Sequence, residues 1–373
     1  MSMTLLDAHN QWANRPADER FPTVKAAYDA CLKYASTAVE KADVNPATLR
    51  VEPVDSDIQL VGKGNIPARL THWAFGQLAA RTGAPAAYLR KLPATLASQN
   101  LNHGLKATYG TVDAPRGDEK VNLLIHSNGS LLVRAFSSEK YSRIWNHELL
   151  AEILKLQEHG WHNPVPFNRG PEESATYESD HDMFCFQVFD RNLVSAGKDA
   201  DGRERQLRRG FIMSNSEVGA AKWRTKMFLY DYMCCNHMIW GAEQVSEVSV
   251  RHVGNASERM QQAMQQFRVE LKRYADGAAS LEEAKIAKAR TYIIAATKQE
   301  VIETVFKKLR GIASQVVIEA GYDTAQKSPD TDASPNSAWA LANGMTRYSQ
   351  TLPYADDRNA VDMAAGKVVE MAF

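Results

Sequence analysis

Residues 210–241 constrain the fold of this chain more than any other segment. Their sequence is GFIMSNSEVGAAKWRTKMFLYDYMCCNHMIWG, an apolar run followed by Ser-Asn-Ser-Glu and a second, longer apolar run. If the second run is helical, its apolar side chains fall on every side and leave no face for water. The sequence therefore predicts a buried helix over residues 220–240 at the centre of the fold. Ser214 and Glu217 fit the capping box of its first turn, with a phosphate-binding or catalytic turn as the alternative.

Composition excludes several classes of protein. The chain has 373 residues, of which 44% are apolar and 24% charged, as in globular proteins with room for more than one core. Its 44 basic and 44 acidic residues cancel, so attraction to nucleic acid would need a local basic patch. No export signal or membrane-length apolar run is recognisable, which predicts a cytoplasmic protein without membrane contact. The four cysteines are poorly spaced for disulfides and are expected to be buried thiols.

Periodicity divides the chain into three predicted segments. Residues 1–115 form an N-terminal helical segment with short strands, in which Pro85 and Pro93 each favour a new helix. Residues 116–254 form a central mixed sheet that contains the buried helix. Residues 255–373 form a helical C-terminal region, whose narrow apolar stripes need a partner surface in the same chain or in a second copy.

The strand and helix pattern predicts an α+β fold. In the N-terminal segment a helix is expected over residues 23–41, and strands over 49–54 and 58–61. Asn128-Gly129 favours a tight hairpin between two β-rich runs. The sheet is expected to be mixed and mainly antiparallel, with hairpin-helix units. Further elements are expected as a helix over 145–159 and strands over 183–190, 206–214 and 245–253, while the polar residues 323–335 read as a linker.

The apolar segment also carries a family resemblance. Together with the following VSVRHVGN, it resembles the signature region of the bacterial, phage and plasmid family catalogued as domain of unknown function 932. QWANRPADERF, RTGAPAAYLRKLP and LLVRAFSSEKYSRIWNHELL also resemble that family, so the resemblance reaches to about residue 265. It implies a role in the replication, recombination or host interaction of a mobile element. The positions that match the family motif are Asn215, Ser216, Gly219, Cys235, Asn236, Arg251 and His252.

A basic cluster gives the first interpretation of function. Arginines close to aromatic residues suit a single-stranded nucleic acid, although a charged, solvated strand edge would have the same composition. We interpret the chain as an accessory protein of a phage or plasmid that binds nucleic acid, with single-stranded DNA in replication or recombination as the candidate ligand. The residues of this cluster are Arg203, Arg205, Arg208, Arg209, Lys222, Trp223, Arg224 and Lys226.

Two alternatives belong to other functional classes. One is an enzyme of unassigned reaction, with a polar site around Asn215, Glu217, Asp231 and His252. Asp231 lies in apolar surroundings and is expected to pair with Arg208, Arg209 or Arg251. The other alternative is a non-catalytic assembly protein that acts through its C-terminal helices, as a homo-oligomer.

The sequence assigns no catalytic residue, cofactor or metal site. Glu178, Asp180, His181 and Asp182 form an acidic cluster that is expected to be a solvated loop. Cys234, Cys235 and His237 lack the spacing of a metal site. No phosphate-binding loop, dinucleotide fingerprint or serine-hydrolase motif is present.

Overall fold

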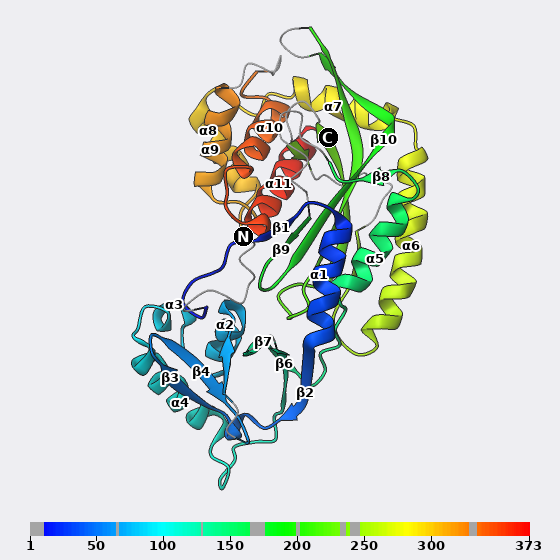
Figure 1. Cartoon of the computed structure of the whole chain (residues 1–373). Coiled ribbons are helices and arrows are strands. Elements are labelled where there is room, and N and C mark those ends of the chain that lie inside the picture. The colour runs from blue at the N-terminus through cyan, green and yellow to red at the C-terminus, as the bar shows by residue number, and fades with distance from the viewer. Residues whose placement is uncertain are drawn as a thin grey trace.

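The computed structural model has an α+β fold with two sheets (Figure 1). It describes residues 11–64, 67–127, 130–164, 176–198, 202–231, 247–327 and 334–373, and the backbone of 236–238. The larger sheet lies in the upper part of Figure 1 and the smaller sheet in the lower part. Helix α1 (Val24–Thr37) packs in the larger part and leads directly into β2 (Ala38–Val44) of the smaller sheet.

The larger sheet is antiparallel and is built around three long strands. β10 pairs with β11, and β11 pairs with β12, while shorter strands flank them on both sides. Its strands are β1 (Glu19–Phe21), β8 (Trp161–His162), β9 (Thr176–Glu178), β10 (Met183–Lys198), β11 (Glu204–Asn215), β12 (Trp223–Asp231), β13 (Asn236–Met238) and β14 (Val248–Val250).

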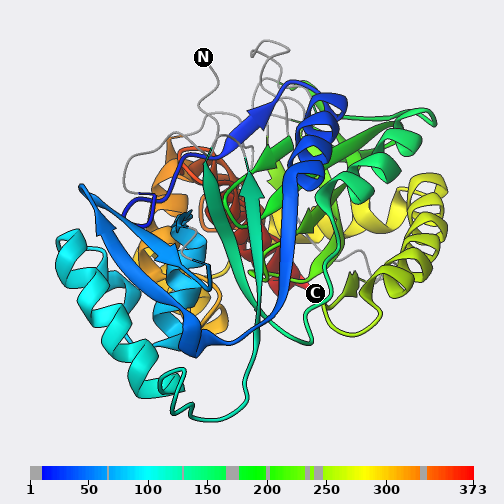
Figure 2. The same ribbon diagram turned by 60° about the horizontal axis from the view of Figure 1, so that its bottom comes forward.

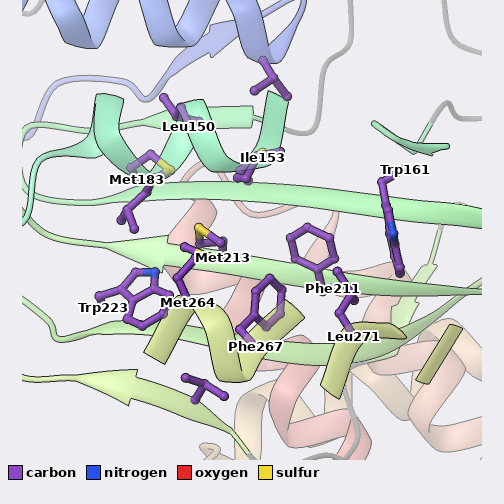
Figure 3. Packing of buried hydrophobic residues seen from close by; sticks show 14 of the residues in the cluster. Leu150, Ile153, Trp161, Met183, Phe211, Met213, Trp223, Met264, Phe267 and Leu271 are labelled. Atoms are coloured by element: carbon purple, nitrogen blue, oxygen red, sulfur yellow. The ribbon is translucent and has the colours of Figure 1, made fainter. Parts of the chain in front are cut away.

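Both faces of the larger sheet are buried. Side chains alternate along β11, so Phe211 and Met213 face one core cluster and Ile212 faces another. Helices α1, α5 (Asn146–Gln157) and α6 (Ala256–Asp276) cover the first face, where Phe267 meets Phe211 at a ring distance of 5.1 Å (Figure 3). Phe184, Phe186 and Phe228 line the second face, against Ala355 of the C-terminal region.

The C-terminal helices form a second core at the end of the β10–β11 hairpin. Val194 and Leu207 of the hairpin pack there against Trp339 and Met345. The apolar stripe of α6 is buried on the larger sheet of the same chain, so the partner surface that it needs is intramolecular. These helices are α7 (Ser280–Thr291), α8 (Lys298–Lys308), α9 (Gln315–Gln326), α10 (Ala338–Ser349) and α11 (Ala355–Val369), followed by a 3₁₀ turn Glu370–Ala372.

The smaller sheet has the strand order β2-β6-β7-β5-β4-β3, and among its described strand pairs β5–β7 is parallel and the others are antiparallel. Figure 2 shows β2, in blue, beside the teal strands β6 and β7. Three helices pack with this sheet: α2 (His72–Arg81), α3 (Ala86–Leu89) and α4 (Ala94–Tyr109). Its other strands are β3 (Arg50–Val54), β4 (Asp57–Val61), β5 (Pro67–Leu70), β6 (Val121–Ser127) and β7 (Leu131–Ser138), and Pro46–Thr48 form a 3₁₀ turn.

Most local predictions agree with these elements. Pro85 and Pro93 occupy the positions just before α3 and α4, and α5 forms where a helix was expected. β6 and β7 form the predicted hairpin, although its turn residues 128–129 lie outside the described residues. The first helix ends at Thr37 rather than near residue 41, because the chain continues as β2. The predicted linker begins inside α9, and residues 328–333 are not described.

The predicted helix over residues 220–240 is wrong. Residues 223–231 form strand β12, and residues 236–238 form β13, while 232–235 and 239–246 lie outside the described residues. Because both faces of β12 are largely buried, apolar side chains occur on both, and the alternation that distinguishes a strand is lost. Ser214 and Glu217 therefore cap no helix, since they lie at the end of β11 and in the turn that follows it.

Asp231 forms the expected buried ion pair, but with a different arginine. Its partner is Arg205 of the neighbouring strand β11, and both side chains are at most 5% exposed. We expect Asp231→Asn to lower the free energy of unfolding by about 3–5 kcal/mol, because it removes the charged partner of Arg205 from a buried ion pair. Urea unfolding of both proteins measures this difference.

The matched control is Asp190→Asn, which affects an exposed pair with Arg208. Exposed pairs contribute about 0–1 kcal/mol, so this variant should unfold almost like the parent protein. Equal effects of the two substitutions would show that burial does not set the strength of the Arg205–Asp231 pair.

Candidate functional site

The two sheets meet at five buried polar residues, which we call the junction network: Arg134, Asn146, Glu178, Asn215 and Glu217. Arg134 comes from β7 of the smaller sheet. The other four come from elements of the larger part: the start of α5, strand β9, the end of β11 and the turn after it. The network therefore joins segments that are far apart in sequence.

Glu217 is the charged centre of the junction network. Its Oε2 lies 3.3 Å from Nη1 of Arg134, and its Oε1 accepts a hydrogen bond of 2.7 Å from the backbone N–H of Asn146. A buried carboxylate needs such partners, because burial removes its hydration. The turn after β11 is thereby fixed both to the smaller sheet and to α5.

Glu178 occupies the other side of the network. It accepts hydrogen bonds from the side chain of Asn146, at 3.2 Å, and from the Cys31 thiol, at 3.3 Å. Burial and the negative charge of Glu217 raise the pKa of Glu178 to about 7. Asn215 completes the network by donating to Asn146 Oδ1 at 2.8 Å. These side chains are bonded to one another in the protein interior, and Asn215 Oδ1 is left without a hydrogen-bond partner among the described residues.

His252 lies beside this network on the Tyr141 ring, with ring centroids 5.3 Å apart and planes nearly parallel. The Tyr141 hydroxyl donates to the carbonyl of Ser216 at 3.0 Å. Burial and the charge of Arg143 lower the pKa of His252 to about 4. The ring is therefore neutral at neutral pH and packs as a buried aromatic group.

A second group of ionisable residues lies in the turn between β9 and β10. The Nδ1 atom of His181 is 2.7 Å from Asp180 Oδ1. Its Nε2 atom faces Asp182 Oδ2 at 3.5 Å and Asp356 Oδ2 at 3.7 Å. The Trp73 ring stacks on the imidazole at 5.0 Å, and the Trp73 backbone N–H donates to Asp180. His181 is 13% exposed, so this group opens to the surface.

Two more residues complete what we call the carboxylate–histidine cluster: Arg15 and Asp18. Arg15 donates to both oxygens of Asp356, at 2.7 and 3.0 Å, and lies 3.6 Å from Asp18. The cluster comprises Arg15, Asp18, Asp180, His181, Asp182 and Asp356. The cluster itself holds four carboxylates and two basic groups, and the charge of Arg358 also acts on Asp18.

The electrostatics of the cluster reflect these charges. Burial opposes a charged imidazole, but Asp180, Asp356 and Asp182 outweigh it and raise the pKa of His181 to about 10. Burial raises the pKa of Asp182 to about 6, despite the opposing charge of His181. A cation that replaced the imidazole proton would compensate the remaining carboxylate charge.

Among the described residues, His181, Asp182 and Asp356 are the set whose ligand atoms lie close enough together to hold a metal ion, all within 4.8 Å. The acidic loop was expected to be solvated, but Glu178, Asp180 and Asp182 are buried. That expectation is wrong because α2 and α11 pack over the loop. Asp180 meets the N-terminus of α2, and Asp356 lies in the first turn of α11.

The predicted nucleic-acid residues do not form one exposed surface. Arg205, Arg209 and Trp223 are buried, and Arg209 donates to the carbonyls of Asn192 and Ala278. The others are exposed or partly exposed: Arg203 near the start of β11, Arg208 paired with Asp190, Arg224 hydrogen-bonded to Ser214, and Lys222 and Lys226 both paired with Glu247.

The alternative polar site comes together only in part. Asn215, Glu217 and His252 lie near one another at the junction, whereas Asp231 is paired with Arg205 elsewhere on the sheet. Of the family-motif residues, Ser216 is buried, Gly219 has a φ of +85° in the turn after β11, and Arg251 is exposed. Asn236 begins β13, and Cys235 lies outside the described residues.

Sequence reasoning did not find Arg15, Arg134 or Asp356. The sequence could have indicated Arg134, because this arginine interrupts the apolar strand LLVRAF and a buried arginine needs a carboxylate partner. No feature of the sequence distinguished Asp356, since acidic residues are common in the first turn of a helix.

Comparison with known proteins assigns the chain to a family. Residues 173–359, half of its length, match the family described as domain of unknown function (DUF932). The chain belongs to this family. The match extends to residue 359, so it includes much of the helical C-terminal region, whereas the resemblance seen in the sequence ended at about residue 265. It begins at residue 173 and therefore excludes the three N-terminal segments that also resemble the family. Neither curated proteins nor solved structures give a match.

Two further findings concern membrane-spanning helices and the cysteines. No described helix combines the length and apolar character that a membrane span requires. Cys31 and Cys185 are buried free thiols, as predicted.

The raised pKa of Glu178 gives a pH-dependent prediction. Between pH 4.5 and about 7 the folded protein keeps a proton on Glu178 that the unfolded chain has lost. This residue therefore makes the free energy of unfolding fall as pH rises through that window, with no further change above it. Glu178→Gln stays neutral, so its stability relative to the parent should increase from about pH 5 to about pH 8.

Urea unfolding of both proteins across this range measures the effect. Exposed Glu139→Gln is the control and should follow the parent curve. A constant difference between Glu178→Gln and the parent at every pH would contradict the assigned protonation of Glu178.

Proposed function

We propose that this protein binds a divalent transition-metal ion through His181, Asp182 and Asp356, and uses it in a hydrolytic reaction. One observation carries the proposal. The His181 Nε2 atom faces two carboxylate oxygens at 3.5 and 3.7 Å, which is too far for good hydrogen bonds. Two ligand atoms held at about 2.1 Å from one ion with a tetrahedral angle lie about 3.4 Å apart, so the spacing suits an ion between them.

The surroundings of His181 support the same interpretation. In many metal sites the ligating histidine donates its other ring N–H to a carboxylate, which fixes the tautomer and the ring orientation. Asp180 supplies that carboxylate here, at 2.7 Å from Nδ1, and is itself held by the backbone of Trp73. The match to the DUF932 family includes all three proposed ligands.

The proposed chemistry follows from the number of ligands. Three protein ligands leave coordination positions open for water, as in catalytic metal sites. A metal ion held by these three residues would lower the pKa of such a water and would supply hydroxide as the nucleophile. Arg15 is partly exposed beside Asp356, where its guanidinium can neutralise an anionic substrate oxygen.

The proposed substrate is a phosphate ester of nucleic acid. We propose this substrate from the site itself, where a metal ion and an arginine would favour a phosphate group. It also suits the mobile-element role that the family resemblance implies. A cytoplasmic location and a homo-oligomeric state remain predictions from the sequence.

Metal titration tests the proposal. After chelator treatment, the full-length protein should bind Zn²⁺ or Mn²⁺ in calorimetry. We expect Asp182→Asn and Asp356→Asn each to weaken binding by at least about tenfold, because each removes a charged ligand. Asp180→Asn should also weaken it, by about 10–100-fold, because it removes the carboxylate that orients His181.

The control is Asp190→Asn, an exposed carboxylate on β10, which should bind metal like the parent protein. Circular dichroism establishes that each variant is folded. Unchanged metal affinity in folded Asp182→Asn and Asp356→Asn would reject the metal site. Metal binding without metal-dependent cleavage of single- or double-stranded DNA or RNA would retain the site and reject the proposed reaction.

A further inference from the structure

The smaller sheet is curled, as its chain connection shows. β2 and β3 are the two edge strands of a six-stranded sheet, yet only residues 45–49 connect them. Six strands laid flat would place the edges about 24 Å apart. The link can span at most about 20 Å when fully extended, and three of its residues form a 3₁₀ turn. The edges must therefore bend toward each other.

The concave side of this curl contains a cavity of about 500 Å³. Its lining comes from β2, β4, β5, β6 and β7 and from the link between β2 and β3. The floor is apolar and includes Leu49, Leu60, Leu123, Ile125 and Val133. Pockets for small molecules typically enclose about 300–1,000 Å³ and are lined mainly by such residues.

Two lysines lie at the mouth of this cavity. Lys41 of β2 is opposite Leu123 in the sheet register and so lies on the same face as the apolar floor. Lys63 follows β4, and both lysines are exposed. Neither forms an ion pair with a described residue. Asp43 is the single carboxylate among the described lining residues, so the mouth has a net positive charge.

We propose that this cavity binds a small ligand with an apolar body and one anionic group, such as a carboxylate. The apolar body would occupy the floor formed by Leu60, Leu123 and Val133, where its burial removes apolar surface from water. The anionic group would lie at the mouth, between Lys41 and Lys63. The site is separate from the carboxylate–histidine cluster, and its residues lie before the segment that matches the family.

Calorimetric titration of the full-length protein with decanoate and with decanol tests this inference. The two probes share an apolar chain and differ in charge, so decanoate should bind about two- to fivefold more tightly. The double variant Lys41→Gln/Lys63→Gln should lower decanoate affinity to the level of decanol and leave decanol binding unchanged. Ala68→Phe, which fills the cavity, should abolish binding of both probes.

The matched control is Lys33→Gln/Lys106→Gln, which removes two exposed lysines from α1 and α4 that do not line the cavity. It should bind decanoate like the parent protein. Absence of decanoate binding to the parent protein would overturn the inference. Equal loss of decanoate affinity in both double variants would also overturn it, because the attraction would then arise from overall charge.

Discussion

The buried ion pair between Arg134 and Glu217 fixes how the two sheets meet. Arg134 belongs to the smaller sheet, and Glu217 lies in a turn of the larger one, so the pair forms only when both are folded and in contact. Loss of either partner would leave a buried charge uncompensated, which is among the costliest single defects in a protein interior. The relative position of the sheets is therefore set by charge as well as by apolar packing.

The carboxylate–histidine cluster depends on that arrangement. His181 and Asp182 come from the larger sheet, but the ring that stacks on His181 and the N–H that holds Asp180 both belong to Trp73, which packs with the smaller sheet. A rotation of one sheet against the other would move the Trp73 ring off the imidazole and the Trp73 N–H away from Asp180. The geometry that makes the cluster a candidate metal site is thus a property of the whole chain.

Elements that depend on neighbouring residues could be predicted from the sequence, whereas contacts between residues far apart in the sequence could not. Pro85 and Pro93 mark helix starts because proline acts on its own backbone, and the β6–β7 hairpin follows from adjacent residues. β12 was mistaken for a helix because burial on both faces removes the alternation of polar and apolar residues. The contact between Arg15 and Asp356 spans 341 positions, and no local pattern encodes it.

The family match covers only some of the residues that build the carboxylate–histidine cluster and hold it in place. It begins at residue 173, so it contains His181, Asp182 and Asp356 but neither Trp73 nor Arg15. Without those two residues Asp180 would lose its backbone hydrogen bond, and Asp356 would lose its bidentate partner. Carboxylates that are free to rotate bind a metal less well than carboxylates already held in place, because their ordering costs entropy. In this chain the matched residues would supply the ligand atoms of the proposed metal site, and Trp73 and Arg15 of the N-terminal part hold the carboxylates in position.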